Sequence, residues 1–178
     1  MSAVPAELIA ALRAAVGAAH VATGDAVGLL DVGWNPHNLD AGIVVSPAST
    51  PEVAAVVRLC AQHGVSLVPQ AGRTGLVGGS MSKPGQIVLS LLRLNQIEPI
   101  DPTERVALVG AGCTLQALQE AAAEHQLEPG IDLAARGSAT LGGMVSTNAG
   151  GVMAFRNGVM RHRVLGLEAV LPLSLIHI

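Results

Sequence analysis

The stretch that decides the fold is residues 137–151, which read GSATLGGMVSTNAGG. A second stretch of the same kind, PQAGRTGLVGGS, lies about seventy residues earlier, at 69–80. Both stretches place Gly, Ser and Thr where a backbone can turn tightly and expose its N–H groups, which lets a chain wrap an anionic diphosphate without charged side chains. Two such loops in one short chain predict one large phosphate-bearing cofactor held from two sides.

The residues before the first loop predict a β-α-β unit. An apolar run at 41–45 is followed by Thr50, a candidate N-cap, with Pro51 at the first helical position. Apolar residues then recur at helical spacing as far as Gly64, where the helix should end. A strand over 65–68 leads into the loop.

Several elements are expected around the second loop. We expect a strand over 86–90 and a hairpin pairing 97–100 with 105–109. Thr114 should cap a helix over 115–125, and a short helix over 142–147 should point its N-terminus at the ligand. A last strand is expected over 164–171, and an amphipathic surface helix between Pro5 and Gly17.

These elements predict an α+β chain with two lobes. The expected parts are an N-terminal helical segment (1–34), a first lobe (35–101), a second lobe (102–172) and a tail (173–178). The tail is interpreted as non-native and the second lobe as incomplete, because after Pro172 the chain departs from the pattern of the family that it resembles, described below. Missing strands would leave apolar surface exposed, so the fragment by itself is expected to lack turnover.

Composition excludes several functions. Trp34 and Phe155 are the only aromatic residues, the net charge is −3, and no basic run exists, so we expect no nucleic-acid partner. Cys60 and Cys113 are isolated and the histidines are scattered, which predicts reduced thiols and no metal site. No apolar span is long enough to cross a membrane and no export signal is recognisable, which favours the cytoplasm and leaves peripheral membrane attachment open.

The common nucleotide fingerprints are absent. Gly110-Ala111-Gly112 has Leu115 where the dinucleotide motif needs its third glycine, and Lys83 does not follow a glycine as a P-loop lysine does.

The chain instead resembles the FAD-binding domain of the p-cresol methylhydroxylase and vanillyl-alcohol oxidase type. The family's first loop, P-x-G-G-x-T-G-L-x-G-G, matches 69–79 with Ala71 in place of one glycine, and G-S-x-x-x-G-G-x-x-x-T-N-A-G-G matches 137–151. A third element, Y-G-x-x-R-x-x-V-L-G-L-E, matches 157–168 with Asn157 in place of Tyr. The resemblance covers about residues 35–172, and the runs 132–133 and 147–151 look most like the D-2-hydroxyglutarate dehydrogenase, D-lactate dehydrogenase and glycolate oxidase branch.

The resemblance implies site residues on both loops. Backbone amides of the first loop would wrap and wall the FAD pyrophosphate, at Gly72, Arg73, Thr74, Gly75, Leu76, Gly79 and Ser80. The second loop would approach the cofactor at Gly137, Ser138, Gly142 and Gly143, and would contact its ribityl and flavin-proximal part at Thr147, Asn148, Gly150 and Gly151. Val164 would offer backbone contacts near the adenine or flavin edge.

Some roles stay open on the residues alone. The Arg73 side chain either neutralises phosphate or is a solvated loop arginine, and Asn148 either bonds the cofactor or caps a turn. The resemblance implies that covalent flavin attachment, where it occurs in the family, uses a histidine of the first loop. Residues 70–80 contain no histidine, so FAD binding should be non-covalent.

The family likeness implies a flavin-dependent oxidoreductase. The reaction would be hydride transfer from the α-carbon of a D-2-hydroxy acid to the flavin, giving the 2-oxo acid. The catalytic base is unassigned, and an unidentified acceptor would take the electrons. The parent protein could pair as a homodimer.

Three alternatives remain. One is a sugar or alcohol oxidase of the same fold, which the missing histidine in the first loop weakly disfavours. The second is a phosphate-ligand binding module without redox chemistry. The third is a fragment without independent function.

Overall fold

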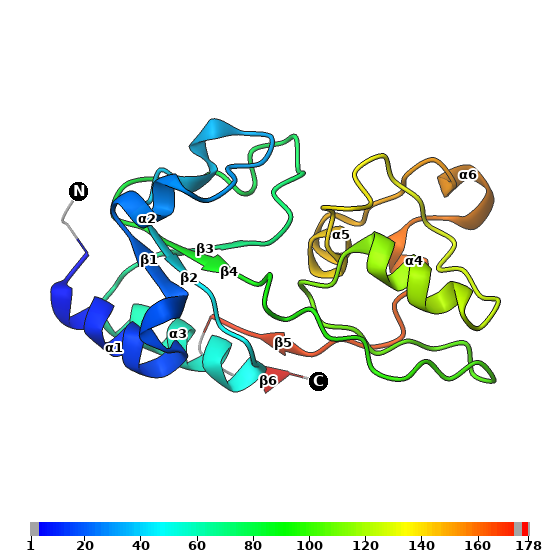
Figure 1. Ribbon diagram of the computed structural model, residues 1–178, viewed down its shortest axis with the longest axis horizontal. Coiled ribbons are helices and arrows are strands. Elements are labelled where there is room, and N and C mark those ends of the chain that lie inside the picture. The colour runs from blue at the N-terminus through cyan, green and yellow to red at the C-terminus, as the bar shows by residue number, and fades with distance from the viewer. Residues whose placement is uncertain (1–3, 173–175, 178) are drawn as a thin grey trace. The chain divides into compact units, whose positions relative to one another are not determined.

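The computed structural model describes residues 4–172 and 176–177, which fold into two compact units (Figure 1). One unit holds the described residues up to Arg93 and from Gly166 on, and the other is Leu94–Leu165. The lobe boundary expected from the sequence lies between residues 101 and 102, eight residues later. Local hydrogen bonds explain the earlier division: Arg93 Nη1 donates to the carbonyl of Ser46 at 2.7 Å, whereas the Leu94 carbonyl accepts from the Gly112 N–H at 2.7 Å. The assignment of the units as two FAD-binding lobes stays a prediction.

A four-stranded sheet forms the centre of the first unit. Its order is β1 (Val21–Thr23), β2 (Ile43–Val45), β4 (Ile87–Ser90) and β3 (Leu67–Gln70). Strands β2 and β3 both run parallel to β4, and β1 runs antiparallel to β2. Helix α3 (Thr50–Gln62) connects β2 to β3, so the expected β-α-β unit is confirmed, with β4 inserted between its two strands.

Side chains on both faces of this sheet are buried. Val44 and Val88 pack with residues from α2 (Asp25–Gly28) and the 3-10 turn η2 (Pro36–Leu39). Val45 and Ile87 are also buried and alternate with them, so they point to the opposite face. Helices α1 (Ala6–Val16) and α3 pack against each other on that side of the sheet (Figure 1). The mixed α and β architecture confirms the predicted α+β class.

Helix ends follow the sequence signals with one correction. The N-cap of α3 is Ser49, whose hydroxyl accepts the Glu52 N–H at 3.3 Å, and not Thr50. The hydroxyl of Ser49 is the one placed three residues before a free helical N–H, so Thr50 becomes the first helical residue. Helix α1 ends before Gly17, at a φ of 88°, as expected.

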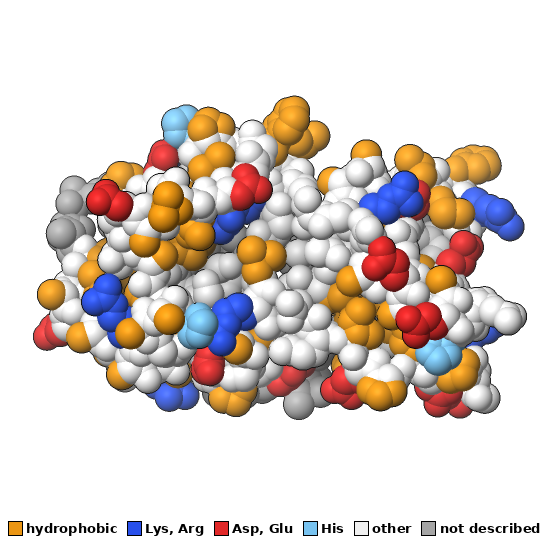
Figure 2. Space-filling view, viewed as in Figure 1, with side chains coloured by type: hydrophobic (Ala, Val, Ile, Leu, Met, Phe, Trp, Pro, Cys, Tyr) orange, Lys and Arg blue, Asp and Glu red, His pale blue; other side chains and the backbone are white. Residues whose placement is uncertain are grey.

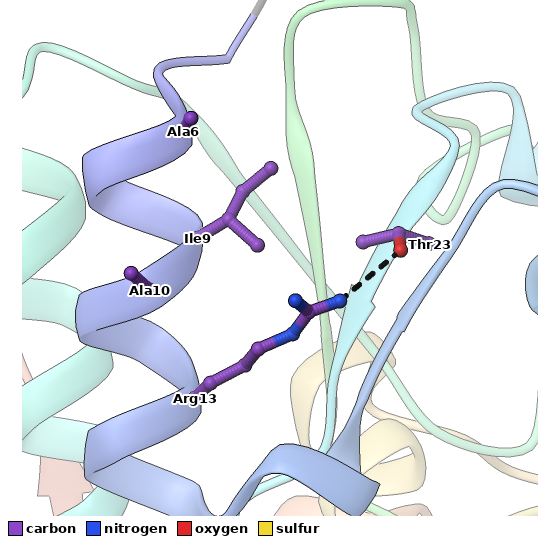
Figure 3. A pocket seen from close by; sticks show the side chains of 5 residues that line it. All are labelled: Ala6, Ile9, Ala10, Arg13 and Thr23. Carbon is purple, nitrogen blue, oxygen red and sulfur yellow. Dashed lines mark hydrogen bonds between the residues drawn. The ribbon is translucent and has the colours of Figure 1, made fainter.

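Large apolar side chains stand exposed on the first unit. Leu29, Trp34, Leu76 and Val77 are each more than two-thirds exposed. Figure 2 shows hydrophobic side chains (orange) projecting from the drawn face, with side chains of both charges between them. An open hollow of about 560 Å³ lies beside α1, lined by Ile9, Arg13 and Thr23 among others (Figure 3). Arg13 bonds Thr23 across it at 3.4 Å, and it contains none of the predicted site residues.

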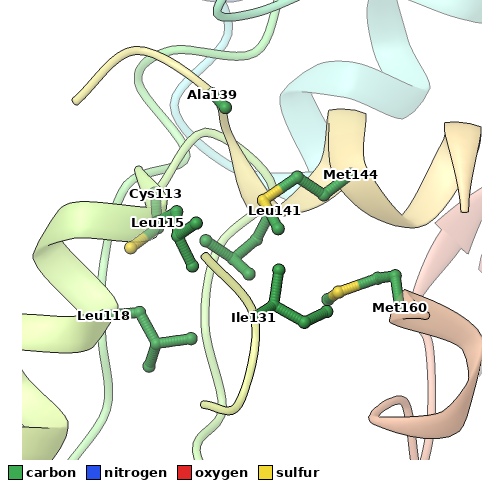
Figure 4. Close-up of a cluster of buried hydrophobic side chains, with 8 residues drawn as sticks. All are labelled: Cys113, Leu115, Leu118, Ile131, Ala139, Leu141, Met144 and Met160. Carbon is green, nitrogen blue, oxygen red and sulfur yellow. The ribbon is translucent and has the colours of Figure 1, made fainter. Parts of the chain in front are cut away.

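The second unit is built on short helices. These are α4 (Leu115–Ala123), α5 (Leu141–Thr147), α6 (Ala154–Asn157) and the 3-10 turn η3 (Met160–His162). Its core gathers one buried cluster (Figure 4), consisting of Cys113, Leu115, Leu118, Ile131, Ala139, Leu141, Met144 and Met160. Thr114 caps α4 through the Ala117 N–H at 3.2 Å, as predicted, and α4 ends two residues before the expected 125.

The expected hairpin is present as a turn with two antiparallel bridges. Ile97 pairs with Val109 and Asp101 with Val106, while Asp101 Oδ1 accepts the N–H of Thr103 at 2.8 Å.

The last expected strand is shorter than predicted. Only β5 (Ala169–Val170) forms, paired with β6 (Ile176–His177), because a strand needs a hydrogen-bonded neighbour and 164–168 find none among the described residues. The rest of the tail for which a non-native origin was predicted, 173–175 and 178, lies outside the described residues.

Candidate functional site

The first glycine loop follows strand β3 directly. Gln70 is the last residue of the strand, and the chain turns back at Gly78, where φ is 76° and the Gly78 carbonyl accepts the Met81 N–H at 3.1 Å. Arg73 also has a positive φ, of 51°, which alternates with ordinary backbone around it. Such alternation turns successive N–H groups toward one side, the geometry of a backbone anion nest.

The N–H groups of this loop are available to a ligand. Within the described part of the chain, no N–H from Gly72 to Ser80 donates an intramolecular hydrogen bond. A Cβ added at Gly75 or Gly79 would meet nothing within 4 Å, so the surroundings of these two glycines are open. Because buried or ligand-facing N–H groups seek an acceptor, this row of donors fits the oxygen-rich diphosphate of a dinucleotide cofactor.

The Arg73 side chain is not a solvated loop arginine. Its Nε donates to Gln70 Oε1 at 2.8 Å, and its Nη1 donates to the carbonyl of Asp31 at 2.7 Å. Partial burial lowers the pKa of Arg73, and the nearby charge of Asp31 opposes that shift. The guanidinium therefore braces the loop, and its positive charge stays beside the free N–H groups.

Several backbone N–H groups of the second glycine loop already donate hydrogen bonds to carbonyls of the same chain. The short helix over 141–147 is confirmed as α5, but its N-terminal donors are not free as the sequence analysis expected. The Leu141 N–H donates to the Cys113 carbonyl at 2.8 Å and the Gly142 N–H to the Ala111 carbonyl at 2.9 Å. Among the first residues of this helix, Gly143 keeps an N–H without a partner in the described structure.

Two predicted site glycines have a packing role. A Cβ at Gly142 would lie 2.7 Å from the Ala111 Cβ and 2.9 Å from its carbonyl oxygen. Gly151 has a φ of 71° and lies against the backbone of Asp132, whose carbonyl accepts the Val152 N–H at 2.9 Å. Both positions need glycine for close backbone approach, whatever they contact besides.

Asn148 forms the left-handed end of α5, with φ 50° and ψ 52°. Its Oδ1 accepts the Arg161 N–H at 3.0 Å, so it caps a turn, while its amide nitrogen donates to no group in the described residues. The Thr147 hydroxyl donates its proton to the Gly143 carbonyl at 3.0 Å, so it has no further hydrogen to donate to a ligand. Val164 packs against the core of the second unit.

Two arginines close in sequence to the second loop have interaction partners within the same chain. Arg136 forms an ion pair with Asp132 at 3.3 Å, and Arg163 Nη2 donates to the Asn157 carbonyl at 2.6 Å.

Both thiols are buried, and burial favours their protonated form. Burial raises the pKa of Cys60 from 9.0 to about 11 and raises that of Cys113. Both cysteines are free, as expected.

The described residues contain no group of three or more His, Cys, Asp or Glu side chains gathered as metal ligands. No helix among them combines the length and the apolar character that a membrane span requires.

The comparisons with known proteins agree with the loops. A family described as FAD binding domain matches residues 41–177, and the chain belongs to this family of FAD-binding domains. The first loop fits that cofactor, since its unpaired N–H groups supply the donors that a diphosphate requires.

Curated relatives share substantial identity. The chain is 43% identical over 137 residues to a D-2-hydroxyglutarate dehydrogenase of Xanthomonas citri pv. viticola, an alignment that covers 77% of this chain and 28% of the relative. It is 41% identical to a D-lactate dehydrogenase of Archaeoglobus fulgidus, over 72% of this chain and 29% of the relative. The chain thus spans under a third of the length of these relatives.

Solved structures show the same fold. An alkyldihydroxyacetonephosphate synthase superposes with a TM-score of 0.83 at 19% identity, covering 95% of this chain and 37% of that one. A p-cresol methylhydroxylase superposes with a TM-score of 0.75 at 23% identity, covering 96% of this chain and 34% of that one. These likenesses confirm the predicted fold family.

Sequence reasoning missed the side chains that hold the first loop. Asn38 and Gln70 are 0% and 4% exposed, and the side chains of both form hydrogen bonds with Ser80 at the end of the loop. Gln70 lies inside the first quoted stretch, and a long amide directly after an apolar strand was a signal that could have identified it.

Proposed function

We propose that this chain is the flavin-binding part of an enzyme that oxidises a D-2-hydroxy acid to the corresponding 2-oxo acid. The observation that carries the proposal is the row of unpaired N–H groups in the first loop, on a chain whose relatives are named for two such acids. Bound FAD supplies the two-electron acceptor that this oxidation needs.

The residues proposed to hold FAD keep the predicted roles. In the first loop, the N–H groups of Gly72, Arg73, Thr74, Gly75, Leu76, Gly79 and Ser80 would donate to the diphosphate, and the Arg73 charge would favour it. In the second loop, the donors with spare capacity include the Gly143 N–H and the side-chain amide of Asn148. Gly137, Ser138, Gly142, Thr147, Gly150, Gly151 and Val164 complete the proposed contact set. Binding is proposed to be non-covalent.

The partners follow the same proposal. They are a small 2-hydroxy acid and an electron acceptor of unidentified class, with a homodimeric parent. We propose a cytoplasmic location, although the relative from Bos taurus is named as mitochondrial.

The experiment is flavin reduction in the whole protein. Purified protein should be yellow, and without oxygen its flavin absorbance should bleach on addition of D-2-hydroxyglutarate, D-lactate or glycolate. The L-enantiomers and glucose are the controls. Bleaching by glucose alone would favour a sugar oxidase. A colourless protein that takes up no FAD would leave a phosphate-binding module or a fragment without independent function.

A further inference from the structure

Three of the most buried polar side chains in the first unit gather at the base of the first glycine loop. Asn38, Gln70 and Ser82 are at most 4% exposed. Burying an amide or hydroxyl without a hydrogen-bond partner is strongly unfavourable. Their position therefore depends on the hydrogen bonds that they make.

Gln70 joins both ends of the loop. It precedes the loop in the chain, and its Nε2 donates to the carbonyl of Ser80, the last residue of the loop, at 2.5 Å. The same nitrogen donates to the Asn38 carbonyl at 2.6 Å. Its Oε1 accepts the Arg73 Nε–H, so this side chain, from the residue just before the loop, contacts both the inside and the end of the loop.

Asn38 supports the same end from outside the loop. Its Oδ1 accepts the Ser80 hydroxyl at 2.9 Å, and its Nδ2 donates to the Val32 carbonyl at 2.8 Å. The Ser82 hydroxyl donates to the Asn38 carbonyl at 2.8 Å and accepts the Ala41 N–H at 3.0 Å. We call Gln70, Asn38, Ser80 and Ser82 the loop clamp.

Besides the clamp and the Arg73 side chain, the described structure gives the loop backbone two hydrogen bonds: the Arg73 carbonyl accepts the Trp34 N–H at 3.2 Å and the Gly78 carbonyl accepts the Met81 N–H at 3.1 Å. N–H groups without intramolecular acceptors add no hydrogen bonds that stabilise the loop, and ordering each residue costs backbone entropy. The side chains of the clamp, with Arg73, supply the missing contacts. A loop that is already ordered binds a ligand more tightly, because binding does not then have to reduce the conformational entropy of the loop.

We propose that Gln70 is a positioning residue for FAD, holding the first glycine loop in the shape that presents its N–H groups to the diphosphate. Gln70 does not itself touch the cofactor. It acts through the Ser80 carbonyl, the Arg73 guanidinium and the Asn38 backbone. This inference rests on the proposed FAD-binding role of the loop.

The test compares Gln70→Met with two controls in the whole protein. Methionine keeps the length of the side chain and removes all three hydrogen bonds. Gln86→Met makes the same change at a glutamine that holds the N–H of Lys83 at 2.8 Å in another turn. Val45→Ala lowers the stability of the same unit from its fully buried core without touching the loop.

Two readouts are measured. The dissociation constant for FAD should rise about tenfold or more in Gln70→Met, since each 1.4 kcal/mol is a factor of ten, while kcat at saturating FAD stays near wild type. In FAD-free protein, trypsin should cleave after Arg73 several times faster in Gln70→Met than in either control, because the Arg73 side chain loses its acceptor on Gln70.

The outcomes separate the two ideas. Gln70→Met that binds FAD no more weakly than Val45→Ala, with equal cleavage at Arg73, would overturn the positioning role. Wild-type protein that binds no FAD would instead overturn the proposed function, and the trypsin arm would still decide whether Gln70 orders the loop.

Discussion

Two adjacent glycines of the second loop differ in whether an added Cβ atom would clash with the chain around it. Gly142→Ala should lower the free energy of unfolding by about 1–3 kcal/mol, since its Cβ would lie 2.7 Å from the Ala111 Cβ. Gly143→Ala is the matched control one residue along the same helix, where the nearest atom is the Thr140 Oγ1 at 3.3 Å. The higher helix propensity of alanine should leave that variant neutral or slightly more stable. Denaturant unfolding of the FAD-free protein measures both, and equal effects would contradict the packing role of Gly142.

The Cys60 thiol should make stability depend on alkaline pH. Its pKa is about 11 in the folded chain against an ordinary 9.0, so the unfolded chain releases the proton first as pH rises. The stabilisation is complete below pH 9, and is lost as the pH passes from 9 to 11, at a slope of up to about 1.4 kcal/mol per unit. Unfolding curves across that range should show this extra slope in the wild type. A Cys60→Ala variant with the same slope would exclude the thiol as its source.

Among the elements, the start of α3 tests the cap directly. Ser49→Ala should destabilise the protein by about 1 kcal/mol, because the Glu52 N–H loses its acceptor, whereas Thr50→Ala should have little effect. Thermal unfolding of the pair measures the difference. A larger loss of stability in Thr50→Ala than in Ser49→Ala would show that Thr50, the residue expected from the sequence, is the N-cap.

Elements also differ in how well local pattern specifies them. Helices α1, α3, α4 and α5 follow apolar periodicity and capping residues, and each was predicted to within a few residues. Strand β1 has only three residues and was missed, because pairing with β2 rather than its own sequence makes it a strand. The strand expected over 164–171 failed for the converse reason, since most of it has no partner among the described residues.

At the scale of the whole molecule, FAD should stabilise the folded protein by mass action. A ligand that binds only the folded state adds about 2.7 kcal/mol at a hundredfold excess over its dissociation constant. The melting temperature should therefore rise with FAD concentration. FMN, which lacks the diphosphate bridge, is the control, and an equal rise with FMN would contradict the role given to the first loop.

The family and its cofactor were predictable from sequence, because the spacing of glycines in 69–80 and 137–151 is a local property that survives without knowledge of the fold. The candidate residues of both loops were named on the same basis, and their contacts with FAD remain predictions.

Only the tertiary structure decided which donors are free. Carbonyls of distant residues accept the Leu141 and Gly142 N–H groups, whereas the N–H groups of the first loop have no acceptor in the described structure. The fold also brings Gln70 and Asn38 into hydrogen-bonding contact with each other and with the end of that loop. A sequence states that an N–H exists, but its availability depends on which carbonyl the folded chain brings within about 3 Å, and those carbonyls lie up to dozens of residues away.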